Sequence, residues 1–184
     1  MKRWSLFALL TAHFALADEG GLKVESRRPD PDGPWEFLVS AHSDATPRTL
    51  ASTVWTYDPE GVEGRMVKRR WVLEESATEK LVFSLLDTPL GKRATLVRWK
   101  LVTLENGAVA VRYASEEGRA PGDDATRITV RGEWVFSIDE HGGTSLEHRQ
   151  MADPHAPVPH WLVRGPQQDA VVRLVREALE RARR

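Results

Sequence analysis

Residues 153–182 read DPHAPVPHWLVRGPQQDAVVRLVREALERA, and this stretch decides the fold. From Ala170 onward the apolar residues recur at helical spacing, while arginines and glutamates take most other positions. The apolar stripe consists of Val171, Leu174, Val175, Ala178 and Ala182. The chain before this stretch has the alternation and turn residues of strands. A long helix that follows a sheet can lie across it and enclose a pocket, so the sequence predicts a binding architecture.

Gly165-Pro166 lies inside this helical stretch. Proline has no backbone N–H and clashes with the preceding turn, so the pair predicts a kink or two abutting helices.

The region before the helix predicts an antiparallel meander. Alternation places one set of apolar residues on a common face: Val67, Trp71 and Leu73; Leu81, Phe83 and Leu85; Val97, Trp99 and Leu101; Val109, Val111 and Tyr113. Arg69 falls within the first group, and Asn106-Gly107 predicts a tight hairpin between the last two.

The clearest strand runs from Thr126 to Ile138, with Trp134 and Phe136 on its apolar face. Gly132 shares that face, where a glycine marks a bend, a bulge or the close approach of another element. The following strand carries Leu146, His148 and Gln150 on one side.

Shorter elements precede the meander. Strands are expected over Leu22 to Arg27 and Trp35 to Ala41. A helix is expected from Pro47 to near Tyr57, with Thr46 as its N-cap.

Residues 1–17 have the pattern of a signal peptide. Lys2 and Arg3 precede an apolar run that ends in Ala15-Leu16-Ala17, which predicts cleavage after Ala17 and one domain over 18–184. An uncleaved anchor is the alternative, but the run is shorter than the ~20 residues of a membrane span. The domain is therefore expected in the periplasm or outside the cell.

Composition narrows the function. A net charge of −1 gives no general attraction to polyanions, so no nucleic-acid partner is expected. The absence of cysteine from the sequence excludes disulfides and a thiol nucleophile. Four histidines between residues 141 and 160 match no metal motif, and no catalytic residue, metal site or cofactor is expected. Arg181, Arg183 and Arg184 fit either transient membrane contact or a helix C-terminus.

Several short motifs occur in the order of one known family. Gly21-Leu22-Lys23-Val24 and Asp44-Ala45-Thr46-Pro47 resemble its opening strand and the entry to its first helix. The matches Gly132-Glu133-Trp134, Gly143-Thr144, Asp153-Pro154 and Pro159-His160-Trp161-Leu162 follow. The chain after Ala17 thus resembles the START (StAR-related lipid-transfer) domain of the helix-grip superfamily, in a bacterial secreted form.

The resemblance implies an α+β helix-grip fold, in which a curved antiparallel sheet wraps around a long C-terminal helix. It also implies a cavity between sheet and helix that binds or transfers a hydrophobic small molecule such as a lipid. The residues expected to line the cavity are Arg69, Trp71, Phe83, Trp99, Tyr113, Trp134, Phe136, His148, Gln150 and Leu162.

Two alternatives stay open. One is a cavity enzyme of the polyketide cyclase or dehydratase type, which needs His148, Glu147 or Arg69 to face the pocket with a perturbed pKa. The other is a protein-interaction module with a filled core. The sequence does not fix the ligand or the oligomeric state.

Overall fold

The computed structural model describes residues 15–18, 21–59, 66–117 and 125–184. The strands in these ranges are β1 (Ala15–Asp18), β2 (Lys23–Arg27), β3 (Glu36–Ser43), β4 (Val67–Glu75), β5 (Glu79–Thr88), β6 (Gly91–Thr103), β7 (Val109–Ser115), β8 (Thr126–Arg127), β9 (Thr129–Ile138) and β10 (Thr144–Asp153). The helices are α1 (Pro47–Thr56) and α2 (His160–Ala182).

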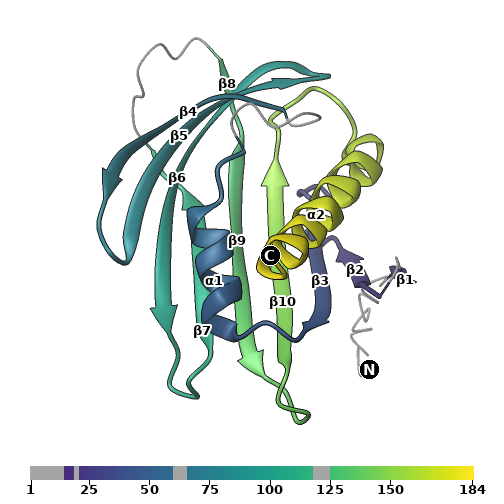
Figure 1. The fold of residues 1–184 in the computed structure, drawn as a ribbon. Coiled ribbons are helices and arrows are strands. Elements are labelled where there is room, and N and C mark those ends of the chain that lie inside the picture. The colour runs from purple at the N-terminus through teal and green to yellow at the C-terminus, as the bar shows by residue number, and fades with distance from the viewer. Residues whose placement is uncertain (1–14, 19–20, 60–65, 118–124) are drawn as a thin grey trace, which may run out of the picture.

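All the strands belong to one curved sheet, which runs in the order β1-β2-β3-β10-β9-β7-β6-β5-β4 (Figure 1). Neighbours along this order are antiparallel. The short β8 lies off this path and pairs in parallel with β6. The consecutive strands β4 to β7 form the predicted meander, and β10 joins β3 to β9.

Both helices lie on the same face of the sheet, as Figure 1 shows. α1 packs on β7 and β9, whereas α2 packs on β3 and β10 and also contacts α1. The main core fills the space between these layers, and α2 contributes Val171, Val172 and Val175 to it. Each of these valines is at most 2% exposed, and full burial of such a side chain stabilises the fold by about 1.5–3 kcal/mol. The α+β helix-grip expectation is confirmed.

The first helix begins where the sequence predicts. The Thr46 side chain accepts a hydrogen bond from the Thr49 amide, and Pro47 occupies the first turn, where its missing N–H costs nothing. Leu50, Ala51 and Val54 are its buried residues.

The last helix is continuous, so the alternative of two abutting helices is wrong. Pro166 lies inside α2. Proline has no N–H to donate to the Leu162 carbonyl, and Leu162 is 50% exposed, so the helix passes Pro166 at its solvent-exposed first turns.

Most of the predicted signal peptide, residues 1–14, lies outside the described residues. Residues 15–18 form β1, an edge strand that pairs with β2. Within the described residues, neither helix has the length and apolar composition needed to cross a membrane.

Candidate functional site

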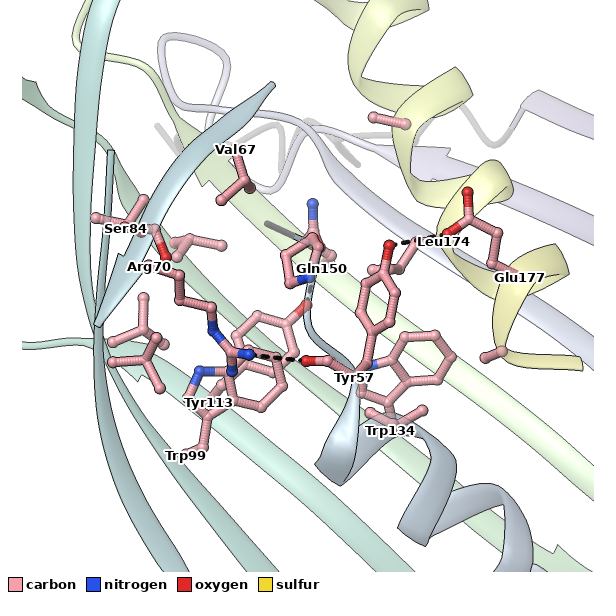
Figure 2. A pocket seen from close by; sticks show the side chains of 18 of the residues that line it. Tyr57, Val67, Arg70, Ser84, Trp99, Tyr113, Trp134, Gln150, Leu174 and Glu177 are labelled. Carbon is pink, nitrogen blue, oxygen red and sulfur yellow. Dashed lines mark hydrogen bonds between the residues drawn. The ribbon is translucent and has the colours of Figure 1, made fainter. Parts of the chain in front are cut away.

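A cavity of about 320 Å³ lies between α2 and the sheet face that α2 covers. Strands β4, β5, β6, β7, β9 and β10 form one wall, and the end of α1 together with α2 forms the other (Figure 2). Much of the wall is apolar, with Val54, Val82, Val97, Val130, Trp134 and Leu174 among its residues. The pocket thus lies where the sequence analysis expects one, between the sheet and the terminal helix.

A bulge in strand β4 determines which of its arginine side chains faces the cavity. The register of β4 against β5 shifts between Val67 and Arg69. Because a bulge adds one residue, it reverses the alternation, so Val67 and Arg70 face the cavity while Arg69 is exposed. The expected Arg69 is therefore outside the lining, and its neighbour Arg70 takes that place.

Trp71 and Phe83 lie on the opposite face of the sheet. They are register partners, with ring centres 5.4 Å apart. Val82 and Ser84 line the cavity, so the alternation of β5 directs Phe83 the other way. There Phe83 packs with Leu81, Ala94 and Leu96 in a second small cluster. β5 is apolar on both faces, and alternation alone does not tell which face is inner.

Four expected residues line the cavity together: Trp99, Tyr113, Trp134 and Gln150. The Trp99 and Tyr113 rings stack at 4.6 Å, and the Tyr113 hydroxyl donates to Gln150 Oε1 at 2.9 Å. Burial raises the pKa of Tyr113, so its phenol stays protonated and remains a donor.

Gly132 makes this contact across β9 possible. It is the register partner of both Tyr113 and Gln150. A Cβ at this position would lie 2.3 Å from the Tyr113 hydroxyl and 2.5 Å from the Arg149 carbonyl oxygen. The predicted close approach at this glycine is therefore confirmed.

His148 lies beneath the cavity floor rather than in its lining. It is fully buried, and its ring stacks on Trp134 at 3.8 Å. Within the described part of the chain, neither ring nitrogen makes a hydrogen bond of standard geometry. Burial lowers the pKa of His148 to about 3, although the Glu133 backbone and the Gln150 side chain nearby oppose this shift. His148 is thus a neutral core residue at pH 7.

The remaining expected residues also lie outside the lining. Phe136 is fully buried in the main core, with its ring 6.1 Å from that of Trp134. Leu162 is half exposed near the start of α2, beside Trp161, which is 67% exposed.

Two cations that the sequence analysis missed lie at the C-terminal end of α1. Lys80 Nζ donates to the Trp55 carbonyl oxygen, and Arg70 Nη1 donates to that of Tyr57 at 2.9 Å. The last carbonyls of a helix carry partial negative charge, which favours cations there. α1 has no basic residue in its own last turn, so β4 and β5 supply these charges.

A second set of polar contacts involves the same end of α1. The Tyr57 hydroxyl donates to Glu177 Oε2 at 2.9 Å (Figure 2), and the Arg181 guanidinium lies 4.2 Å from the centre of the Tyr57 ring. These contacts join the end of α1 to α2. On α2, the cavity residue Leu174 is next to the core residue Val175, and Ala178 belongs to both the lining and the core.

None of the three residues that the enzyme alternative requires lines the cavity. Of the three residues that the enzyme alternative requires, Glu147 and Arg69 are exposed and His148 lies behind Trp134. Within the described ranges, no group of three or more His, Asp or Glu side chains could hold a metal ion. Binding is what the arrangement supports best.

Comparison with protein-family models and with curated proteins finds no match. Solved structures match over most of the chain. A STAR-related lipid transfer protein from Xanthomonas axonopodis is 20% identical, covers 93% of this chain and 99% of its own, and has a TM-score of 0.77. Human StAR-related lipid transfer protein 5 is 14% identical over 95% of this chain and 89% of its own, with a TM-score of 0.69.

An enzyme also shares the architecture. The Zhui aromatase/cyclase from Streptomyces sp. R1128 is 14% identical over 81% of this chain and 93% of its own, with a TM-score of 0.56. The helix-grip fold of this chain is therefore similar to that of these two lipid-transfer proteins and of this aromatase/cyclase.

Proposed function

We propose that this protein binds and carries a hydrophobic small molecule of the lipid class in the cavity between α2 and the sheet. The observation that carries the proposal is the cavity itself, which has a largely apolar wall and occurs in a fold shared with lipid-transfer proteins. Small-molecule pockets typically measure roughly 300–1,000 Å³ and combine an apolar lining with a few polar groups. A cavity of about 320 Å³ argues against a filled core.

The first test is extraction of the purified protein with organic solvent, followed by mass spectrometry. A co-purified lipid in near-stoichiometric amount is the expected result. Binding is then measured with a fluorescent lipid probe added to the delipidated protein, and Trp99 and Trp134 in the wall provide an intrinsic signal.

One helix offers a matched pair of variants. Leu174→Glu puts a carboxylate into the apolar wall and should abolish probe binding. Leu162→Glu makes the same change at an exposed position outside the lining and should leave binding unchanged. Equal probe affinities for the two folded variants would contradict the proposed location of the site.

We also propose that the protein is a bacterial exported protein, with residues 1–17 removed as a signal peptide. Lys2, Arg3, the apolar run and Ala15-Leu16-Ala17 support this. Expression in a Gram-negative host should give a periplasmic or secreted protein that starts at Asp18. Bulky residues at positions 15 and 17 should block cleavage, and an intact N-terminus on the unmodified protein would refute the proposal.

A further inference from the structure

The charges that line the cavity are mostly positive. Among the described lining residues, Arg70, Lys80, Arg173 and Arg181 are cations, and Glu177 is the carboxylate. Arg173 and Arg181 are exposed to solvent, whereas Lys80 is buried and Arg70 is partly buried. Placing cations beside an apolar wall costs free energy unless an anion or polar group compensates them. An excess of positive charge in a lipid-sized pocket therefore points to the chemistry of the ligand's polar end.

Lys80 is the most deeply placed of these cations. The residue is 4% exposed, and its ammonium group lies 4.4 Å from the centre of the Trp55 ring and 5.7 Å from that of Trp99. Within the described ranges, its ammonium group donates one hydrogen bond, to the Trp55 carbonyl, although an ammonium has three donors. Burial and the neighbouring Arg70 lower the pKa of Lys80 to about 8, while Glu75 and Asp58 oppose that shift. Lys80 is therefore mainly charged at pH 7.

Arg70 adds a second positive charge beside Lys80, and Figure 2 shows its side chain within the cavity. Its side chain is 11% exposed, and Nη1 lies 3.5 Å from Asp58 Oδ1. The Asp58 side chain is 62% exposed, so water screens this ion pair. The same guanidinium caps α1 through Nη1, so Arg70 is held at the edge of the cavity beside Lys80.

We propose that the ligand is a single-chain amphiphile with a carboxylate headgroup, of the fatty-acid class, and that Lys80 and Arg70 bind this headgroup. The inference rests on the proposed function and specifies its ligand. Hydrogen bonds between a carboxylate and cationic donors are short and strong, particularly where water is excluded. The cavity volume lies at the low end of the usual range, which favours one acyl chain along Val82, Val97 and Leu174 over two.

The test compares three ligands of equal chain length on the wild-type protein: a fatty acid, the corresponding alcohol and the corresponding amine. At pH 7 the acid should bind at least about tenfold more tightly than the alcohol, as expected for hydrogen bonds to charged groups, and the amine should bind most weakly. Equal affinities for acid and alcohol would overturn the carboxylate proposal and leave the proposed function standing. Binding of none of the three would overturn the proposed function itself.

Two further measurements assign the effect to Lys80. Lys80→Met should weaken acid binding about tenfold relative to alcohol binding, because a carboxylate loses more than a hydroxyl when the ammonium is removed. The control Lys100→Met removes a lysine from neighbouring β6 that is exposed and pairs with Glu79 at 3.0 Å, so it should change neither affinity.

The pH dependence needs no variant. Acid binding to the wild-type protein should weaken severalfold between pH 7 and pH 10, as Lys80 loses its proton. Alcohol binding should stay constant over the same range. Acid binding that does not change with pH would exclude Lys80 as a headgroup ligand.

Discussion

Gly132 has no room for a side chain, although it lies within a regular strand. A Cβ there would collide with the Tyr113 ring and hydroxyl and with the Arg149 backbone. The Tyr113 hydroxyl could not then bond to Gln150. The arrangement of these two side chains in the cavity therefore requires a glycine at position 132.

Gly132→Ala should destabilise the protein by about 1–3 kcal/mol, because the Arg149 carbonyl belongs to the sheet and cannot yield easily. Urea unfolding measures this change. Tyr113→Phe is the control: it removes only the hydrogen bond to Gln150 and should cost about 1 kcal/mol. A Gly132→Ala protein as stable as the wild type would contradict the close contact.

His148 should make stability depend on pH. Its folded-state pKa of about 3 lies below the ordinary value of 6.5, so the unfolded chain binds the proton more readily. Stability is therefore fully present above about pH 6.5 and is lost as the pH falls toward 3, at about 1.4 kcal/mol per pH unit for one proton.

Urea titrations at several pH values measure this slope, and His148→Phe keeps an aromatic ring while it removes the titrating group. The variant should lose less stability than the wild type between pH 6.5 and pH 4. Identical slopes for the two proteins would mean that His148 is not buried in a neutral form.

Among the secondary-structure elements, α2 contributes adjacent residues to the hydrophobic core and to the cavity lining. Val175 is fully buried in the core, whereas Leu174 is half-buried and lines the cavity. The helix is therefore both a structural element and part of the binding surface.

Alanine substitutions should separate these two roles. Val175→Ala should lower the free energy of unfolding by about 2 kcal/mol, since it removes buried methyl groups and leaves a void. Leu174→Ala should cost less stability and mainly weaken ligand affinity. Chemical unfolding and probe binding on both variants provide the measurement, and a larger loss of stability in Leu174→Ala would reverse the assignment.

The elements themselves were largely predictable from the sequence. The N-cap at Thr46, the hairpin at Gly107 and the stripe of α2 each have a local cause, and the structure has each of them. The continuity of α2 through Pro166 was not predictable, because it depends on the exposure of the preceding turn.

The candidate site was predictable only where strands are regular. Trp99, Tyr113, Trp134 and Gln150 follow simple alternation and line the cavity. The bulge in β4 moves Arg70 inward, and it leaves no mark in the apolar pattern. Lys80 was missed because a lysine in a strand usually points to solvent. Here its ammonium group is buried and donates to the Trp55 carbonyl at the end of α1.

At the scale of the whole molecule, the sheet ends in β1 on one side and in β4 on the other. β1 pairs with β2 and no other strand of the described sheet, so its loss would leave the rest of the order intact.

A protein that begins at Asp18 should therefore still fold and unfold cooperatively, because β1 pairs with β2 alone among the described strands. Thermal unfolding of both forms tests this. A truncated protein that fails to fold would show that β1 is required for the sheet.

Because α2 carries both core residues and cavity-lining residues, it also limits how the ligand can enter and leave. Lifting this helix from the sheet would expose Val171 and Val175 together with the ligand, so that route would require partial unfolding. Tyr57, Pro59 and Met66 also line the cavity and are not part of the main core. Uptake and release past these three side chains would let the protein change its contents on a timescale unrelated to its unfolding rate.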